Sequence, residues 1–392
     1  MPKLRFPGFE GEWTRNRLDE VASVNPASPE IPLHFYYIDL ESVDAGILSE
    51  IKEITKSDAP SRAQREVRIN DILFQTVRPY QKNNYFMQEE FGLPVFASTG
   101  YAQIRTENNP YFLYSLLHTK RFLNNVLLRC TGSSYPAINS NDLKEIEIYT
   151  PCQLEQSKLS LFMSLIDKRI EKQKQLIETV KKYKRGLLSS MFPEKGEAIP
   201  KHRFSGFTEP WEQRKLSELI IEYKETVESD CELPVLTSSK TEGVLLQEEH
   251  FGRKQSHDIT GYNVLPRNYC TYRNRSDGID FTFNINKCCD KGIISKFYPV
   301  FCGNGNDTFF ISLMLNNSDE VVREIGYTCI GTGQKVLAFS DLLKMYLRVP
   351  IYEEQKKIAA YFDNLDHLIT LHHYKLKMAI KLKESLLQQL FI

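Results

Sequence analysis

The chain has no long apolar stretch. None of its hydrophobic runs approaches the ~18 residues that a membrane-spanning helix needs, although 41% of its 392 residues are hydrophobic. Its first five residues, Met-Pro-Lys-Leu-Arg, also lack the apolar segment of a signal peptide. The sequence therefore predicts a cytoplasmic chain with no membrane partner, long enough for two to four domains.

Paired cysteines are also missing. The chain has eight cysteines, but no two are spaced as CxxC, and six of them lie in its second half. Zinc sites and disulfide frameworks are recognised by regular cysteine spacing, and in a repeated chain they would recur in each repeat. We therefore expect no bound metal.

Catalytic motifs are equally scarce. The chain has no Walker loop, no paired-histidine site and no nuclease-like Asp…Glu-x-Lys pattern. Residues 109–112 (Asn-Pro-Tyr-Phe) lack the second proline of an amino-methyltransferase motif and favour a helix that begins with proline. Residues 301–305 (Phe-Cys-Gly-Asn-Gly) resemble a cofactor loop, but no catalytic motif follows them. We expect no catalytic residue and no cofactor bound by this chain.

The formal net charge is zero, but it is unevenly distributed. Residues 1–150 hold 16 basic and 19 acidic side chains, a balance of −3, whereas residues 151–195 hold 10 and 5, a balance of +5. A protein that binds DNA must bring positive charge to the phosphates. If the segments outside 151–195 bind DNA, they must do so with local basic patches.

A long helix is predicted over residues 151–192. Pro151 opens it, and no glycine or proline follows until Gly186. About 40 residues at ~1.5 Å each make a helix roughly 60 Å long. Its apolar residues recur alternately three and four apart, which is typical of a helix that pairs lengthwise with another. The seam residues predicted here are Leu159, Phe162, Ile166, Leu176, Val180 and Leu187.

The partner helix lies in the same chain. Residues 350–391 repeat the stretch from 151 at an offset of 199, so that Pro151, Glu155 and Gln156 recur as Pro350, Glu354 and Gln355. The predicted seam residues of this second helix are Ile358, Tyr361 and Leu365. An Arg-Phe-x-Gly-Phe opening followed by the only two tryptophans also recurs, at Arg5 to Trp13 and at Arg203 to Trp211.

This duplication predicts an α+β fold with an internal pseudo-twofold repeat. Two mixed α/β domains alternate with two long helices that pair lengthwise as a coiled coil. The predicted boundaries are 1–150 for the first domain, 151–192 for the first long helix, 193–202 for a linker, 203–349 for the second domain and 350–392 for the second helix.

Each predicted domain carries one basic loop. Residues 62–82 hold five basic groups against two acids, and residues 253–296 hold eight against four. Arginine reads guanine edges, asparagine reads adenine, and both lysine and arginine hold phosphate. A solvated loop is the equally weighted alternative. The candidate DNA-binding residues are Arg62, Arg65, Arg68, Arg78, Tyr80, Lys82 and Asn83 in the first domain, and Arg253, Lys254, Arg273, Asn274 and Arg275 in the second.

This layout resembles the specificity subunit of type I restriction–modification enzymes. The resemblance covers nearly the whole chain and rests on the paired helix openings at Pro151 and Pro350, on the Phe-x-Gly-Phe…Trp openings, and on Gly-Thr-Gly-Gln-Lys at 331–335. It implies a DNA-contact role for Thr332, Gln334 and Lys335. The first copy has Ser-Ser-Tyr-Pro at 133–136 instead, so that role does not carry over to the first domain.

The resemblance also implies the function and the partners. Each domain would be a target recognition domain for one half of an asymmetric, bipartite site in double-stranded DNA. The two long helices would pair antiparallel, set the spacing and bind two methyltransferase subunits. Restriction/translocase subunits would join the complex, and S-adenosylmethionine, ATP and Mg would bind on the partner subunits. The alternatives are a duplicated coiled-coil adaptor that binds only proteins, and a stand-alone methyltransferase, for which the motifs are missing.

Overall fold

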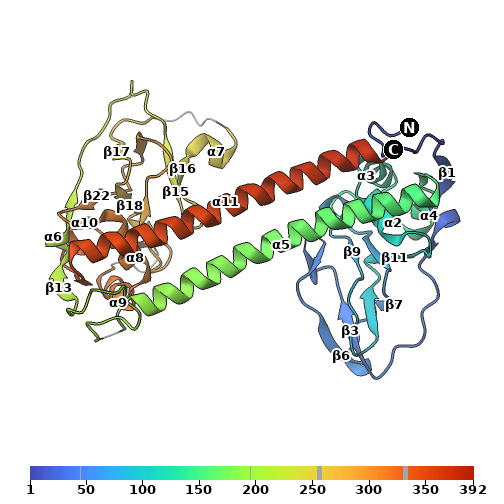
Figure 1. Ribbon diagram of the computed structural model, residues 1–392, viewed down its shortest axis with the longest axis horizontal. Helices are drawn as coiled ribbons and strands as arrows, with labels where there is room; N and C mark the ends of the chain where they lie inside the picture. Colours follow the sequence, from blue (N-terminus) through green and yellow to red (C-terminus); the bar gives the residue numbers. More distant parts are fainter. Residues whose placement is uncertain (45, 195, 254–257, 330–333) are drawn as a thin grey trace. The chain divides into compact units, whose positions relative to one another are not determined.

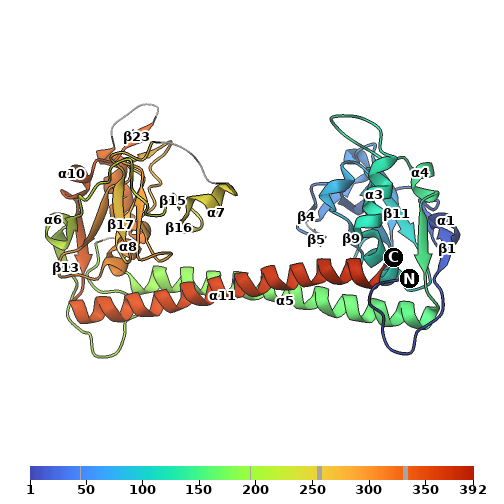
Figure 2. The same cartoon turned by 90° about the horizontal axis from the view of Figure 1, so that it is seen from above.

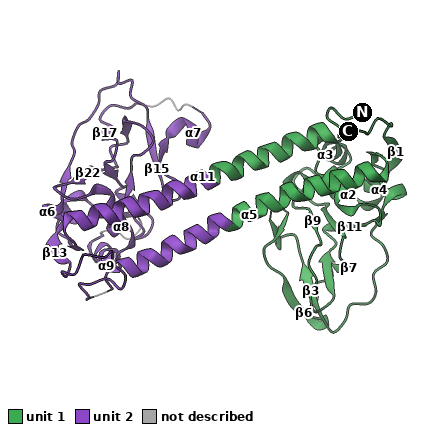
Figure 3. Cartoon of the chain, viewed as in Figure 1, with its two compact units in different colours: residues 1–175, 373–392 green, residues 176–372 purple. Residues whose placement is uncertain are grey.

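The computed structural model describes residues 1–44, 46–194, 196–253, 258–329 and 334–392 (Figures 1 and 2). It divides into two compact units, which Figure 3 colours separately. Unit 1 comprises residues 1–175 and 373–392, and unit 2 comprises residues 176–372. Among the described residues, no helix combines the length and apolarity needed to cross a membrane.

Two 39-residue helices dominate the chain, α5 (Gln153–Met191) and α11 (Tyr352–Leu390). Each contributes one half to unit 1 and the other half to unit 2. Together with the mixed helices and strands of both units, they confirm the predicted α+β class and the duplication.

The remaining elements of unit 1 are mainly short strands. They are β1 (Thr14–Arg17), α1 (Leu18–Val21), β2 (Ser23–Val24), β3 (His34–Ile38), β4 (Val43–Asp44), β5 (Ile47–Leu48), β6 (Lys52–Thr55), η1 (Lys56–Asp58), β7 (Ala63–Val67), β8 (Ile72–Gln75), η2 (Pro79–Gln81), β9 (Tyr85–Phe86), β10 (Val95–Ser98), β11 (Tyr101–Arg105), α2 (Pro110–Leu117), α3 (Lys120–Leu128), α4 (Ser140–Lys144) and β12 (Glu147–Thr150).

Unit 2 repeats much of this order. Its elements are β13 (Glu212–Lys215), α6 (Leu216–Leu219), β14 (Ile220–Glu222), β15 (Leu236–Ser239), β16 (Gly243–Leu246), α7 (Gln247–Phe251), β17 (Asn263–Pro266), β18 (Cys270–Thr271), β19 (Arg275–Ser276), β20 (Asn284–Ile285), β21 (Lys291–Ile294), β22 (Val300–Gly303), α8 (Thr308–Asn317), α9 (Asp319–Thr328), β23 (Lys335–Val336), α10 (Phe339–Leu342) and β24 (Tyr346–Val349).

The sheets show which parts of the repeat are shared. The pair β1-β12 recurs as β13-β24, and the four-stranded sheet β2-β11-β8-β9 recurs as β14-β22-β18-β20. The second sheets differ. Unit 1 has a four-stranded sheet β6-β3-β10-β7, in which β3 and β10 run parallel, whereas unit 2 has two separate two-stranded sheets, β15-β16 and β17-β21.

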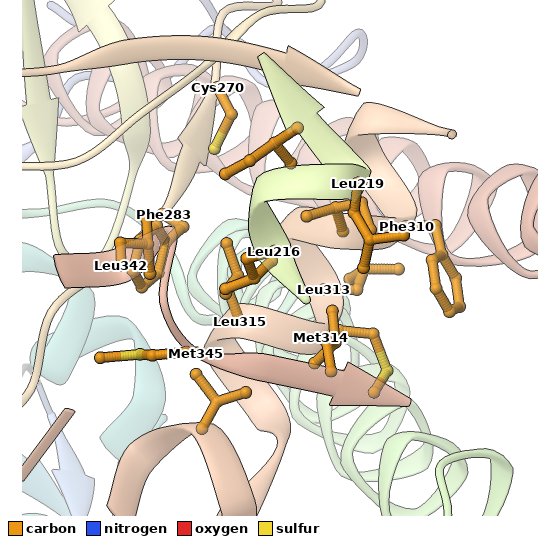
Figure 4. Close-up of a cluster of buried hydrophobic side chains, with 14 of the residues drawn as sticks. Leu216, Leu219, Cys270, Phe283, Phe310, Leu313, Met314, Leu315, Leu342 and Met345 are labelled. Atoms are coloured by element: carbon orange, nitrogen blue, oxygen red, sulfur yellow. The ribbon is translucent and has the colours of Figure 1, made fainter. Parts of the chain in front are cut away.

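Both cores are built on the same aromatic arrangement. In unit 1, Trp13 packs edge-on against Phe112 of α2 and Phe391. In unit 2, Trp211 packs against Phe310 of α8 and Phe192. Figure 4 shows part of the unit 2 core, which includes Phe310 of α8, Leu216 of α6 and Met345 from the segment between α10 and β24. The repeated tryptophan therefore packs against α2 or α8 and against the residues that follow the end of a long helix.

The repeated sequence motifs meet each other in space. Arg5 donates two hydrogen bonds of 2.7 Å to the buried Glu155 carboxylate on α5, and Arg203 makes the same pair of bonds with Glu354 on α11. Gln156 donates to the carbonyl oxygen of Pro151 at the start of α5, as Gln355 does to Pro350. Each Arg-Phe-x-Gly-Phe segment therefore clamps the first turns of one long helix.

The two long helices run antiparallel in both units. In unit 1, Lys383 Nζ lies 2.6 Å from Asp167 Oδ1, and in unit 2, Lys184 Nζ lies 2.5 Å from Asp366 Oδ1. Residue numbers rise along one helix as they fall along the other. The two ion pairs are related by the offset of 199, and charged groups at a helix seam select one register over others.

Burial along α5 divides the residues of the predicted seam into two groups. Along α5, Leu159 is buried, and Ile166, Val180 and Leu187 are half-buried. The predicted seam residue Leu176 is 41% exposed, whereas its neighbour Ile177 is only 2% exposed. The residues of α5 that are buried or paired with α11 at seven-residue spacing are instead Met163, Ile170, Ile177, Lys184 and Met191.

The same shift occurs in α11. Ile358 is buried and Leu365 is half-buried. Phe362 is fully buried, whereas the predicted seam residue Tyr361 is half-exposed. The hydroxyl oxygens of Tyr361 and Tyr183 share a hydrogen bond of 3.0 Å. The heptad was ambiguous because adjacent positions, such as 162 and 163, are both apolar. The ring centres of Phe162 and Phe6 lie 5.5 Å apart. The long helix also packs against the other elements of unit 1, so it needs an apolar face wider than a coiled-coil seam.

Two motif-like segments have structural roles. Pro110 is the first residue of α2, after Asn109 at the N-cap, which confirms the helix-start interpretation. Gly303 ends strand β22, and a Cβ there would collide with the backbone of Asn306. The glycine is required by a tight turn, so the segment from 301 to 305 has a fold-based explanation.

Candidate nucleic-acid interface

The basic loop of unit 1 stands on a buried polar support. Gln75, at the end of β8, donates from Nε2 to Gln81 Oε1 at 2.8 Å and accepts from the backbone of Asn83 at 3.1 Å. The Gln75 backbone donates to Asn84 Oδ1 at 2.8 Å. Gln75 and Asn84 are 2% and 3% exposed. These bonds hold residues 78–84 in one conformation, so their exposed side chains are presented by a rigid turn.

Arg78 is the first residue of this turn. It has φ +53°, and its guanidinium lies 4.2 Å from the ring centre of Tyr135. Its backbone donates to the carbonyl oxygen of Pro136 at 2.7 Å, which ties the turn to the loop 131–136. Its Nε is buried and has no hydrogen-bond partner among the described residues. A stacked guanidinium is held flat, which suits bidentate contact with a base or phosphate.

The arginines of β7 and its flanks fall into two groups. Arg68 is paired with Glu66 at 2.7 Å, so its charge is partly compensated. Burial lowers the pKa of the Arg65 guanidinium, and its Nε has no hydrogen-bond partner within the described part of the chain. Arg62 is exposed. Arg62 and Arg65 are therefore better placed than Arg68 to attract an anion.

The other predicted residues of this loop, Tyr80, Lys82 and Asn83, lie in different surroundings. Tyr80 is 50% exposed at the tip of η2. Lys82 is half-buried, has φ +57°, and lines a cavity beside α2. The backbone N–H of Asn83 donates to Gln75 Oε1 and so helps to fix the turn.

In unit 2, Arg275 of the second basic loop lies on the strand pair β19-β23. Arg275 pairs with Val336 and Ser276 with Lys335. The Arg275 guanidinium lies 4.7 Å from the ring centre of Phe297, and Lys296 Nζ lies 5.9 Å from the same ring. The structure therefore brings Arg275 and Lys335 onto one strand pair, with exposed Gln334 beside them.

The backbone of Asn274 is held in place by two hydrogen bonds. Its backbone donates to Phe297 at 2.9 Å and accepts from Leu337 at 3.0 Å. Arg273 is exposed, and so is Arg253 at the far end of the predicted patch. Lys254 and Thr332 lie outside the residues that the structure describes.

Arg273 and Arg275 line a small polar cavity of about 140 Å³. Lys240 and Asp280 form an ion pair in its wall, and this hydrogen bond keeps the pKa of the Asp280 carboxyl below its usual value. Ser276 also donates to Asp280, at 3.2 Å. The cavity presents both cationic donors and a carboxylate acceptor, the two kinds of group that distinguish base edges.

The strand pairing corrects the alignment of the two basic loops. Ile138 donates to the carbonyl oxygen of Thr76 in unit 1, as Leu337 does to Asn274 in unit 2. Asn274 is thus the counterpart of Thr76, and Arg78 corresponds to Ser276 rather than to Arg273 or Arg275. The two units place an arginine over an aromatic ring, but from different positions.

Sequence reasoning missed four residues at these sites: Tyr135, Lys240, Asp280 and Phe297. The aromatic rings are separated from their arginines by 57 and 22 positions (135 − 78 and 297 − 275). No local signal marked them, because the contacts form only when the strands pair.

Comparison with known proteins identifies the repeat. The family model described as type I restriction modification DNA specificity domain matches the chain twice, over residues 11–182 and 208–382. These two matches cover most of the chain and do not favour the protein-only adaptor. Among curated proteins, no match was found.

Solved structures agree on the fold. The type I restriction–modification S subunit from M. genitalium matches with a TM-score of 0.61 and 14% identity, covering 100% of this chain and 99% of that one. A chain from a structure on complex assembly and conformational transition of the type I R-M system matches with a TM-score of 0.53 and 20% identity, covering 97% of each chain.

Proposed function

The chain belongs to the family of type I restriction modification DNA specificity domains, and on that premise we propose that each of its two units reads one half of a split DNA site. As a DNA specificity subunit, the chain selects the sequence on which a restriction–modification system acts. The observation that carries the two-reader proposal is the double family match, because its two segments fall on the two units.

The basic loops supply the chemistry for reading. Arg78 and Arg275 are each held over an aromatic ring, at 4.2 and 4.7 Å, and stacking of this kind limits the orientations of a guanidinium. Phosphate contacts give most of the affinity and base contacts the specificity. Since the loops differ in residues and position, the two half-sites are expected to differ in sequence.

Methylome sequencing tests this function. A host that carries the whole system is compared with the same host lacking only this gene. We expect one bipartite motif, two short specified halves around an unspecified spacer, to lose its methylation when the gene is removed. A methylome that is identical with and without the gene would contradict the proposal.

The chain is proposed to be non-catalytic, with the chemistry on methyltransferase and restriction/translocase partners that bind S-adenosylmethionine, ATP and Mg. The purified full chain is incubated with labelled S-adenosylmethionine and DNA that contains the motif. No label should be transferred until a methyltransferase subunit is added. Transfer by the chain alone would refute this part.

The long helices are proposed to bind the methyltransferase subunits and to set the spacing. The support is an apolar face of α5 that unit 1 leaves uncovered: Leu154, Leu161 and Leu165 are 77%, 62% and 56% exposed and lie on one side of the helix. Contiguous exposed apolar residues on a helix are typical of protein-binding surfaces.

An insertion tests the spacing role. Seven residues added near Lys172 and seven near Tyr374 preserve the heptad and lengthen the pair by roughly 10 Å, or about three base pairs. We expect a spacer that is longer by about that amount, with both halves unchanged. An unaltered spacer would show that the helices do not set the distance.

A further inference from the structure

Unit 1 contains a cavity that DNA reading does not use. Its volume is about 400 Å³, within the range of roughly 300–1,000 Å³ that is usual for small-molecule sites. It lies between α2, the turn after η2, and the unit 1 halves of α5 and α11. All of its lining residues belong to unit 1.

Aromatic rings form one wall of this cavity. Phe86 meets the ring of Tyr111 edge-on at 5.0 Å and that of Tyr114 at 5.4 Å, and Tyr85 also lines the space. Burial raises the pKa of Tyr85 to about 12 and raises that of Tyr114 as well, so both hydroxyls stay protonated at neutral pH. The Tyr111 hydroxyl donates to Asp167 at 2.6 Å, so Tyr85 and Tyr114 supply the hydroxyls of a wall whose aromatic composition suits a planar aromatic ligand.

His118 supplies a fixed acceptor beside these rings. Its Nδ1 lies 2.8 Å from the carbonyl oxygen of Tyr114, which favours the tautomer with the proton on Nδ1. Burial, followed by the charge of Lys383, lowers the pKa of His118 to about 4. The ring is therefore neutral at physiological pH, and the Nε2 lone pair accepts one long hydrogen bond, of 3.5 Å, from Asn84 Nδ2.

The half-buried charges in the cavity wall that form no ion pair among the described residues are both positive. Lys82 and Lys174 line it, both are half-buried, and neither forms an ion pair with any described residue. The acids that also line it without an ion pair, Glu89, Glu171 and Glu384, are exposed to solvent. A half-buried ammonium without a partner favours an anion at that end of the site.

Unit 2 shows what the same frame looks like without these groups. The ion pair Asp167–Lys383 beside the cavity is repeated there as Asp366–Lys184. The counterparts of Tyr111, Tyr114 and His118 at an offset of 198 are, however, Phe309, Ser312 and Asn316. Both polar counterparts are used internally, because Ser312 and Asn316 donate to the carbonyl oxygen of Phe283 at 2.9 and 2.8 Å.

The aromatic wall, the neutral histidine and the two unpaired lysines are thus additions to unit 1 that the shared frame does not need. We propose that this cavity binds a nucleotide. Its base stacks on the tyrosines and donates to His118 Nε2 in place of the long bond from Asn84, and its phosphate pairs with Lys82 and Lys174. The nucleotide is either free or an unpaired nucleotide of a DNA strand.

Calorimetric titration of the full chain with adenosine monophosphate tests this site. We expect saturable binding of one molecule per chain, about tenfold weaker in Lys174→Ala and restored in Lys174→Arg. Tyr114→Ser, which installs the unit 2 residue, should abolish binding. Circular dichroism confirms that each variant is folded, and Lys174, on the surface of α5, can be replaced without removing core packing.

The matched control is Lys287→Ala in unit 2, where Lys287 lies 3.8 Å from the ring centre of Phe309. This variant should bind adenosine monophosphate as the unaltered chain does. A short single-stranded oligonucleotide that competes indicates that the nucleotide comes from DNA, and absence of competition indicates a free nucleotide. The proposal is overturned if adenosine monophosphate does not bind, if Lys174→Ala binds it equally well, or if inorganic phosphate binds as tightly.

Discussion

Units 1 and 2 share one frame and differ in what is attached to it. Both have the buried arginine–glutamate clamp, the tryptophan packed on a helix, the same four-stranded sheet and the same lysine–aspartate pair between the long helices. They differ in the second sheet, the basic loops and the cavity beside α2. The repeated parts hold the helices, and the divergent parts carry ligand-binding chemistry.

The largest effect is expected at the helix seam that both units share. Ile177→Asp places a carboxylate at a position that is 2% exposed and should destabilise the chain by about 5 kcal/mol. Leu176→Asp, at a position that is 41% exposed, should cost less than about 1 kcal/mol. Urea unfolding measures both. Equal losses would mean that the seam assignment is wrong.

The clamps should be equivalent in the two units. Glu155→Gln and Glu354→Gln each leave a buried arginine without its carboxylate, at a cost of about 3–5 kcal/mol. The carboxylates are 1% and 0% exposed, so solvent screens neither pair. Thermal unfolding should show similar losses for the two variants. A large loss in one and none in the other would break the equivalence of the frames.

His118 should make unit 1 alone sensitive to mild acid. The pKa of His118 is about 4 in the folded chain and 6.5 in the unfolded chain. Between these two pH values the unfolded chain therefore binds more protons. Stability from His118 is therefore complete above pH 6.5 and falls as the pH drops toward 4, by up to about 3 kcal/mol. His118→Asn, which copies Asn316 of unit 2, should flatten that part of the profile. Identical pH profiles would contradict this assignment.

The reader arginines should act on one half-site each. Arg78→Ala should relax the first half of the methylated motif, and Arg275→Ala the second, with about 1–3 kcal/mol lost in DNA binding. Arg68→Ala provides the matched control, because its charge is already compensated by Glu66. Loss of selectivity at both halves from either substitution would show that the readers are not independent.

The sequence predicts the frame far better than the sites. Repeated residues such as Arg5, Glu155 and Trp13 mark the duplication because their contacts recur in both units. The heptad locates Leu159 and Ile358 but not Ile177, since apolar residues occupy adjacent positions. Tyr135 and Phe297 could not be assigned, because their arginines reach them only through strand pairing distant in sequence. Lys82 was predicted as part of a charged loop, but the cavity that it lines could not be predicted, because five segments distant in sequence form it.

The central claim is that each unit reads its own half of the DNA site. The most direct measurement is the methylome of a host in which residues 20–148 are replaced by the corresponding segment of another specificity subunit. The segment excludes the clamp at Arg5 and both long helices, so the frame is retained. The account predicts a motif with a new first half and an unchanged second half and spacer. A motif in which both halves change, or neither does, would contradict it.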